Sequence, residues 1–347
     1  MVETVLVAFM PVTAFSLPLP DSYHASLILL GAAFLDYLVG DPWNWLHPVQ
    51  VMGWCISRYS QWAFAHLKSP IVLKFAGISL TVLLVMGSAG ISYGMIRLLQ
   101  AVHPIVGTIA ELIVLASCFA GKSLRDAAQD VLGPLLQGKL SEARSRLSRY
   151  VGRDTADLDA SEILRAVVET VAENGVDGVM APLFWAIVGS FTPIGAAPIG
   201  LGFKAASTLD SMVGYLRAPY TDLGWCSAKT DDLLIWLPCR LTVVTLGLLS
   251  GKPGHVWQLC WRDGRQDPSP NSGWSECVYA AVLGVQLGGS NTYQGQVKHK
   301  PLLGNPDRSI TAEVVNQALW LNRVTFLLWL AIAILIHAGL LRWGQFG

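Results

Sequence analysis

Three carboxylates are spaced for shared chemistry in the segment between residues 169 and 178. Glu169, Glu173 and Asp177 recur at every fourth residue, which would put all three on one face of a helix. Their mutual repulsion must be relieved by a metal ion, a cationic substrate or a Lys or Arg partner. Because an apolar segment begins at Met180 directly after them, the pattern predicts chemistry at a membrane surface.

Polar side chains near the N-terminus form a second candidate group. Asp36 lies inside an apolar run, and an ionisable residue within a membrane helix is a functional hypothesis by default. Asp41 and His47 follow on a segment that two prolines would stiffen. Since Asp41 stands directly before a proline, a simple turn or cap role is the alternative for it.

A third group follows a Gly- and Pro-rich apolar segment. Lys204, Thr208, Asp210 and Ser211 supply an amine, a carboxylate and two hydroxyls within about two helical turns. Lys204 and Asp210 are not spaced as neighbours on a helix face, so a simple surface ion pair explains them poorly. The pattern favours contact with a ligand.

A basic group stands at the end of an apolar run. Gly121-Lys122-Ser123 resembles the end of a phosphate-binding P-loop, but Ala116 replaces the first glycine of that motif and no strand is expected before it. Lys122 and Arg125 could still bind an anion at a helix start near the membrane. The alternative is that they anchor a helix end at the lipid headgroups.

Further polar residues lie in the C-terminal half. Asp231 and Asp232 stand before an apolar run, where they could contact a ligand or serve only as helix caps that favour the helix dipole. A tight polar turn then enters a helix of small residues, and such a loop can bring backbone donors close to phosphate. The candidate residues in and after this turn are Asn271, Ser272, Glu276 and Lys300.

The composition places these groups in a membrane protein. Only 14% of the residues are charged, against about 25% in soluble domains. The clearest span runs from 324 to 341, long enough to cross about 30 Å of hydrocarbon, and segments 71–99 and 105–120 form a further pair. Segments 27–39 and 233–250 could be spans or partly buried core helices. We therefore predict an all-α, polytopic integral membrane protein with about four to six membrane segments.

One apolar segment, residues 179–203, cannot be a regular span. It is broken by Gly189, Pro193, Gly195, Pro198 and Gly200. Two half-helices or a re-entrant hairpin are expected, with a proline-kinked span as the alternative.

The simplest organisation is one membrane-embedded domain, residues 1–347, with two polar insertions. Residues 122–177 and 262–312 are rich in Lys and Arg, so the positive-inside rule predicts both in the cytoplasm. The first should hold a helical pair whose second helix starts after Asp159 or Ser161. The six cysteines include no C-x-x-C pair, which predicts neither a zinc site nor a disulfide frame, and zero net charge gives no electrostatic case for nucleic acid.

Taken in order, these motifs resemble the adenosylcobinamide-phosphate synthase family of cobalamin biosynthesis, the CobD/CbiB family, along nearly the whole chain. One departure is Ser207, where the resemblance leads us to expect Asn before Thr-Leu-Asp. The blocks that carry the resemblance are Asp36 with Gly40-Asp41-Pro42 and His47-Pro48, Lys122-Ser123-Leu124, Val151-Gly152-Arg153-Asp154-Thr155, residues 169–182, 208–215 and 228–232, Ser269-Pro270-Asn271-Ser272-Gly273, and Lys300-Pro301.

The resemblance implies an enzyme of the bacterial inner membrane, with its active site on the cytoplasmic side. Such an enzyme joins adenosylcobyric acid to aminopropanol phosphate, or to aminopropanol, as an amide. The reaction is written with ATP and Mg²⁺, which suggests an acyl phosphate intermediate. The implied partners are these two substrates and membrane lipid, together with a homo-oligomer or other corrinoid enzymes. The cobalt ion enters with the corrin ring.

Charge and spacing suggest how the residues divide the work. We expect Glu173 and Asp177 to hold Mg²⁺, Glu169 to be a third ligand or the base, and Lys204 to act in catalysis on a phosphate group. The substrate contacts are expected from Asp36, Asp41, His47, Lys122, Arg125, Arg153, Asp154, Asn174, Thr208, Asp210, Ser211, Asp231, Asn271, Ser272, Glu276 and Lys300. The corrin ring could lie on surfaces near Trp43, Trp45, Trp225, Trp257 and Trp261, unless these residues only anchor helices at the membrane interface.

Two other classes of protein remain open. A transporter or channel would also use broken helices and intramembrane acids, although no internal repeat is evident. A scaffold for corrinoid enzymes would not need so many acids and bases in turns.

Overall fold

The computed structural model describes residues 22–40 and 47–344. Asp41, Trp43 and Trp45 therefore lie outside the described residues. In chain order the elements are α1 (Ser22–Leu38), α2 (Pro48–His66), α3 (Pro70–Val102), α4 (Pro104–Ala116), α5 (Gly121–Leu136), α6 (Leu140–Leu147), α7 (Ala160–Gly175), the π-helix η1 (Val176–Met180), α8 (Ala181–Ser190), α9 (Ala196–Val213), α10 (Tyr220–Leu223), α11 (Trp225–Leu249), α12 (Pro253–Arg262), the short 3₁₀ helix η2 (Gly264–Gln266), α13 (Ser272–Leu283), β1 (Leu287–Tyr293), β2 (Gln296–Leu303) and α14 (Ala312–Gly344).

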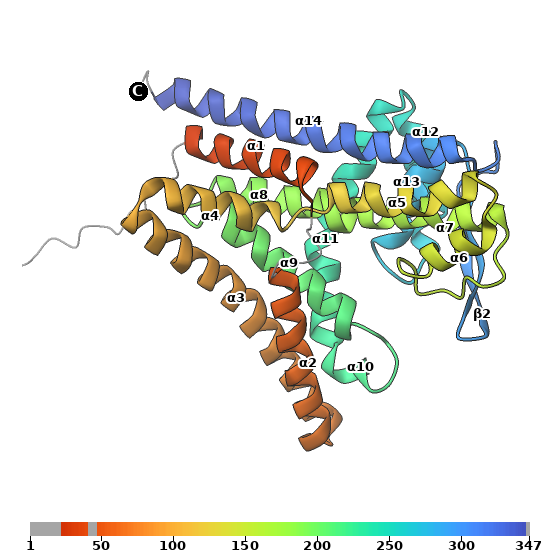
Figure 1. The fold of residues 1–347 in the computed structure, drawn as a ribbon, viewed down its shortest axis with the longest axis horizontal. Coiled ribbons are helices and arrows are strands. Elements are labelled where there is room, and N and C mark those ends of the chain that lie inside the picture. Colours follow the sequence, from red (N-terminus) through yellow and green to blue (C-terminus); the bar gives the residue numbers. More distant parts are fainter. Residues whose placement is uncertain (1–21, 41–46, 345–347) are drawn as a thin grey trace, which may run out of the picture.

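The chain is a mostly helical, multi-pass membrane protein, as the composition predicts. Four stretches are long and apolar enough to cross a membrane: Pro70–Val102, Pro104–Leu136, Trp225–Leu249 and Ala312–Leu341. The second of them joins α4 and α5, which lie end to end in Figure 1. Segment 233–250 therefore belongs to a helix of spanning length, whereas α1 is shorter.

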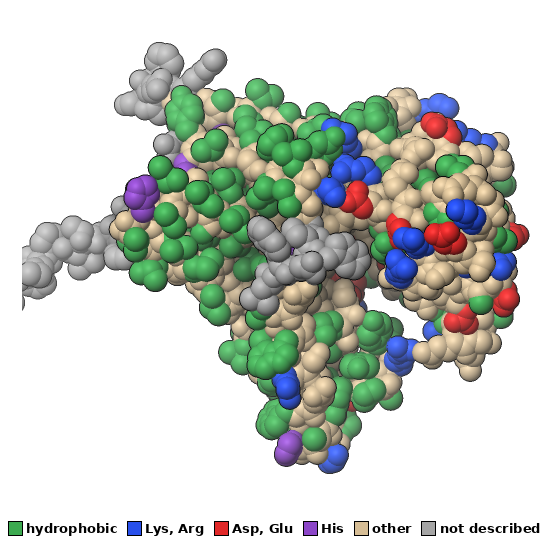
Figure 2. Space-filling view, in the orientation of Figure 1, with side chains coloured by type: hydrophobic (Ala, Val, Ile, Leu, Met, Phe, Trp, Pro, Cys, Tyr) green, Lys and Arg blue, Asp and Glu red, His purple; other side chains and the backbone are tan. Residues whose placement is uncertain are grey.

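The surface divides into an apolar and a charged part. Apolar side chains cover the side formed by α1, α3 and α4, and charged side chains gather at the opposite end, around α5, α6 and α7 (Figures 1 and 2). Helices α2 and α3 run out from this body together with α10 as an arm. This separation is what a protein half immersed in lipid requires.

The interrupted segment 179–203 forms two helices, α8 and α9, that pack against each other. The turn between them depends on Gly195, whose φ of +94° is unfavourable for any residue with a Cβ. Gly189 lets the helices approach closely, because a Cβ there would lie 2.6 Å from the Gly195 carbonyl oxygen. The predicted break into two helices is confirmed.

The predicted polar insertions pack around one large core with α7 at its centre. Helix α7 begins where expected, since the Asp159 carboxylate accepts a hydrogen bond from the Glu162 amide at 2.9 Å. The helix over residues 140–147 is also confirmed, and α5 adds a third helix to the predicted pair.

The second insertion contains an element that the sequence analysis does not anticipate. Strands β1 and β2 pair antiparallel as a hairpin, with Tyr293 opposite Gln296. Gln294 and Gly295 form its turn with positive φ angles of 52° and 77°, the geometry of a tight hairpin turn. This hairpin carries Lys300 towards the carboxylates of α7.

Candidate active site

A cavity of about 600 Å³ brings together several of the acidic residues that the sequence analysis selected. It lies between the arm, the end of α7 and the hairpin, where Figure 2 shows a hollow beside the arm. The predicted residues that line this acidic cavity are Glu173, Asp177, Asp210, Asp231, Asn271, Ser272 and Lys300.

Glu173 and Asp177 stand at the junction of α7 with the π-helix η1, whose wide turn is a feature often found at functional sites. Burial raises the pKa of the Glu173 carboxyl above its usual range, and the nearby Asp267 and Glu169 carboxylates add to this effect. Burial raises the pKa of Asp177 further, together with the negative charges of Glu173 and Asp231. Both carboxyls therefore occupy a site with too little positive charge.

That excess of negative charge fits a cation. Among residues 22–40 and 47–344, no three His, Cys, Asp or Glu side chains are grouped closely enough to hold a metal ion by themselves. Mg²⁺ is commonly bound by only one or two carboxylates, with waters and substrate phosphates as its other ligands. Glu173 and Asp177 are suited to this mode, in which the phosphate completes the site.

Asp231 and Asp232 are not helix caps. Helix α11 begins at Trp225, so both residues lie within the helix, and both line the acidic cavity. The expectation of an N-cap is wrong because the helix starts earlier, in the polar residues before the apolar run. Lys229 lies 3.3 Å from the Asp232 carboxylate, one turn away on α11.

Asn271 joins two walls of the acidic cavity. Its amide nitrogen donates to the Asp232 carbonyl oxygen at 2.8 Å, and its amide oxygen accepts from Arg240 at 2.8 Å. Asn271 is 5% exposed and directly precedes α13. It therefore holds the start of α13 against α11.

Two of the three lysines that line the acidic cavity, Lys298 and Lys300, come from the hairpin, and the third is Lys229 of α11. Lys300 donates to the Glu276 carboxylate at 3.0 Å, and Glu276 itself is 1% exposed. Burial raises the pKa of Glu276 to about 7 despite the neighbouring ammonium group. Lys298 also lines the cavity and lies over the Tyr293 ring, 5.5 Å from its centroid.

Glu169 has a different environment from Glu173 and Asp177. Its carboxylate pairs with Arg153 and, at 2.7 Å, with Arg165, and it also accepts from the Gly288 amide at 2.9 Å. Both arginines also donate to the side-chain oxygen of Asn291 on β1. The spacing left open whether a metal ion, a cationic substrate or a Lys or Arg residue balances these carboxylates, and for Glu169 the partners are arginines. This buried network joins α7 to the hairpin.

Asp154 and Asn174 do not line the acidic cavity, and their side chains form hydrogen bonds with backbone groups. The Asp154 carboxylate accepts from the amides of Gln294 and Gly295, at 3.1 and 2.8 Å, and so fixes the hairpin turn. The Asn174 side chain is exposed and donates to the Thr170 carbonyl oxygen at 3.0 Å.

The selected hydroxyls and amine of α9 do not line the acidic cavity. Thr208 and Ser211 donate to carbonyl oxygens one turn back along the helix. Lys204 does not line the acidic cavity, although Asp210 on the same helix does. His47 caps α2, where its ring accepts from the Val49 amide at 3.3 Å.

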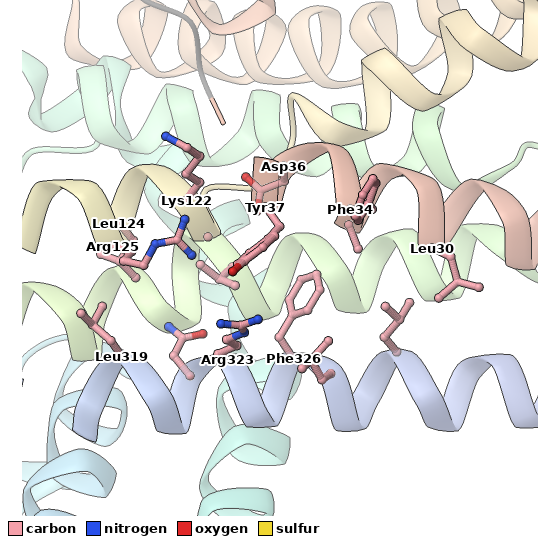
Figure 3. A pocket seen from close by; sticks show the side chains of 16 residues that line it. Leu30, Phe34, Asp36, Tyr37, Lys122, Leu124, Arg125, Leu319, Arg323 and Phe326 are labelled. Carbon is pink, nitrogen blue, oxygen red and sulfur yellow. The ribbon is translucent and has the colours of Figure 1, made fainter. Parts of the chain in front are cut away.

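The structure places Asp36, Lys122 and Arg125 elsewhere, in a second cavity of about 400 Å³ between α1, α5 and α14 (Figure 3). Helix η1 contributes to both cavities, with Val179 in this one and Asp177 in the acidic one. The predicted site residues that line a cavity thus fall into two groups. The others line neither cavity: His47, Arg153, Asp154, Glu169, Asn174, Lys204, Thr208, Ser211 and Glu276.

The tryptophans that the sequence analysis selected also lie in different places. Trp225 lines the acidic cavity. Trp257 and Trp261 instead pack edge-on against Trp274, with ring centroids 5.4 and 6.3 Å away, in a cluster that holds α12 against α13.

Several lining residues were missed by the sequence analysis. Lys298 and His299 could have been found only from the strand register, because a hairpin was not expected. Tyr215 ends the block 208–215 and Asp267 stands just before the turn that starts at Ser269, but neither has a spacing that marks it as a site residue.

A multi-pass helical membrane protein with an acidic cavity at its polar end is a class to which carriers and enzymes both belong, and sequence comparison decides between families. A family model described as "CobD/Cbib protein" matches residues 29–322. The chain belongs to the CobD/CbiB family, and it is a cobalamin biosynthesis protein.

Individual relatives are similar to this chain along almost their full length. The chain is 50% identical over 320 residues to the cobalamin biosynthesis protein CobD of Synechocystis, covering 91% of this chain and 94% of the relative. It is 39% identical to the cobalamin biosynthesis protein CbiB of Salmonella typhimurium, with 88% and 95% of the two chains covered. It is 42% identical to CobD of Photorhabdus laumondii, with 84% and 92% covered. No solved structure matches the chain.

Proposed function

We propose that this protein is a membrane ligase that joins the amine of aminopropanol phosphate, or of aminopropanol, to a propionate carboxylate of adenosylcobyric acid, at the expense of ATP. Membership of a cobalamin biosynthesis family implies a corrinoid substrate. The observation that carries the proposal is the acidic cavity, in which Glu173 and Asp177 face further carboxylates and the hairpin lysines.

The reaction consists of two displacements. The corrin carboxylate oxygen first accepts the terminal phosphoryl group of ATP, which gives an acyl phosphate and ADP. The substrate amine nitrogen then attacks the acyl carbon, so that a C–N bond forms, the C–O bond to phosphate breaks and phosphate leaves. The nitrogen gives up a proton in this second step, which requires a base nearby.

The residues of the acidic cavity match these needs. Glu173 and Asp177 would hold Mg²⁺, which neutralises phosphate charge during transfer. Lys298 and Lys300 on β2 are placed to bind phosphate oxygens. Asp210 and Asp231 supply further carboxylates from α9 and α11, and we assign to them the acceptance of the amine's proton. Glu169, paired with two arginines, positions the hairpin instead.

The shape and location of the acidic cavity suit a corrinoid. It opens at the polar end of a membrane body, and Tyr215, Leu216 and Trp225 form an apolar and aromatic part of its wall. A corrin ring is amphipathic and could lie against this wall with its carboxylate towards Asp177. Because ATP is cytosolic and the insertions are basic, we place the active site on the cytoplasmic side.

Substitution of the two proposed Mg²⁺ ligands tests this function. Glu173→Ala and Asp177→Ala should each abolish formation of the amide while the protein still inserts into the membrane. Glu142→Ala, which removes an exposed carboxylate of α6, is the matched control and should leave turnover unchanged. Near-normal turnover in either of the first two variants would refute the proposed metal site.

A further inference from the structure

The second cavity has two chemically different ends. On α14 its lining residues recur with helical spacing: after Leu319 they pass from the polar Asn322 and Arg323 to the apolar Phe326, Leu327 and Leu330. Helix α1 runs beside α14 in Figure 1, and Leu30 and Phe34 lie towards the apolar end in Figure 3. The cavity is therefore a groove with an apolar length and a polar end.

The polar end is positively charged. Arg125 and Arg323 both lie over the Tyr37 ring, with guanidinium carbons 5.0 and 4.5 Å from its centroid, and Figure 3 shows Tyr37 between them. Among the lining residues within 22–40 and 47–344, Asp36 is the one acidic side chain, against these two arginines and Lys122. Lys122 pairs with Asp126, and Arg125 approaches the same carboxylate at 3.9 Å. No ion pair of Arg323 occurs within residues 22–40 and 47–344, so the cluster retains a net positive charge.

The apolar walls of the groove face outward. Phe34 of α1 is 64% exposed, and Leu327, on the candidate membrane span of α14, is 50% exposed. In a membrane this face meets acyl chains. Arg323 stands directly before the apolar run 324–341, which places its guanidinium at the depth of the headgroups.

We propose that this groove binds one anionic glycerophospholipid, with its phosphate at Arg125 and Arg323 and an acyl chain along Leu30, Phe34 and Leu327. Charge complementarity selects an anionic headgroup, and two arginines held on one ring are suited to phosphate oxygens. Helix α5 begins at Gly121 in the cavity, which adds the positive end of its dipole to the site. A water-soluble phosphate would leave the apolar length of the groove unused.

Binding can be measured apart from catalysis, so this proposal and the ligase proposal can fail separately. Protein freed of lipid in detergent is titrated with phosphatidylglycerol and with phosphatidylcholine, and the bound lipid is counted by native mass spectrometry. We expect one phosphatidylglycerol to bind in preference to phosphatidylcholine. Equal binding of both lipids would overturn the proposal, because the arginines would then not recognise headgroup charge.

Variants locate the lipid. Arg125→Gln combined with Arg323→Gln should weaken phosphatidylglycerol about 30-fold, since each arginine near an anionic lipid contributes roughly five-fold. Arg97→Gln changes an exposed arginine of α3 outside the groove and should bind as the unmodified protein does. Unchanged affinity in the double variant would place the lipid elsewhere and overturn the proposal.

Soluble ligands provide a further arm that needs no variant. Inorganic phosphate, ATP and aminopropanol phosphate are each added to the unmodified protein loaded with phosphatidylglycerol. We expect the lipid to remain bound at millimolar concentrations of all three. Displacement by any of them would assign the cavity to a substrate instead of a lipid.

Discussion

Replacement of Glu169 by Gln should destabilise the protein by about 3–5 kcal/mol, the usual cost of removing one partner from a buried charge pair. The Glu169 side chain is 3% exposed, and its partners Arg153 and Arg165 are 7% and 10% exposed. Without the carboxylate, the buried Arg153 guanidinium loses its counter-charge, and Arg165 keeps only its pair with the more exposed Glu162. The Gly288 amide also loses its charged acceptor. The hairpin should then separate from α7.

Thermal unfolding in detergent, followed by intrinsic tryptophan fluorescence, measures this loss. Glu142→Gln breaks an exposed pair with Arg146 and should cost at most about 1 kcal/mol, which makes it the matched control. Glu173→Gln should instead stabilise the protein, because neutralising a carboxyl whose pKa is raised by burial removes the free-energy cost of burying its charge. In the unmodified protein the folded pKa of the Glu173 carboxyl lies above 4.5. The stabilisation should therefore be present at pH 8 and fade as the pH falls below this folded pKa. Equal unfolding temperatures for Glu169→Gln and Glu142→Gln would refute the structural role of Glu169.

Two further substitutions test the walls of the acidic cavity. Lys300→Met leaves the Glu276 carboxylate without its ammonium partner, which raises its folded pKa beyond about 7. Stability should therefore fall as the pH rises above 4.5 and keep falling to a higher pH than in the unmodified protein. Parallel pH profiles of the unfolding temperature would contradict this. Asn271→Ala should cost about 1–3 kcal/mol, because the Arg240 and Asp232 groups that it bridges lose their partner. Asn174→Ala, at an exposed site, should change stability by less than about 0.5 kcal/mol, and a similar loss in both variants would remove the bridging role.

Much of the fold could be predicted because lipid imposes a strong pattern on sequence. The span 324–341, the break in 179–203 and the start of α7 after Asp159 all depend on local signals: an apolar run, Gly and Pro, and a capping carboxylate. The hairpin was missed because its strands contain glycines, a proline and many polar residues, and apolar and polar side chains do not alternate strictly along them. The main local feature that indicates the hairpin is its tight turn at Gln294-Gly295.

The candidate site could be predicted only in part. Helical spacing correctly placed Glu173 and Asp177 together, since that relation is local. Spacing allowed for the Arg165–Glu169 pair, which is i,i+4 on α7, but it could not show that Arg153 from outside the helix also meets Glu169. The division of the predicted residues between two cavities depends on which faces of α5, η1 and α11 turn inward, and only long-range packing decides that.

The central claim is that the acidic cavity catalyses an ATP-dependent ligation, and turnover by the purified protein tests it most directly. The protein in detergent is incubated with adenosylcobyric acid, aminopropanol phosphate and Mg²⁺, with and without ATP, and the corrinoid is followed by mass spectrometry. We predict a product with the mass of the amide that forms only when ATP is present. Absence of this product from folded protein that has both substrates and ATP, or its formation at the same rate without ATP, would contradict the account.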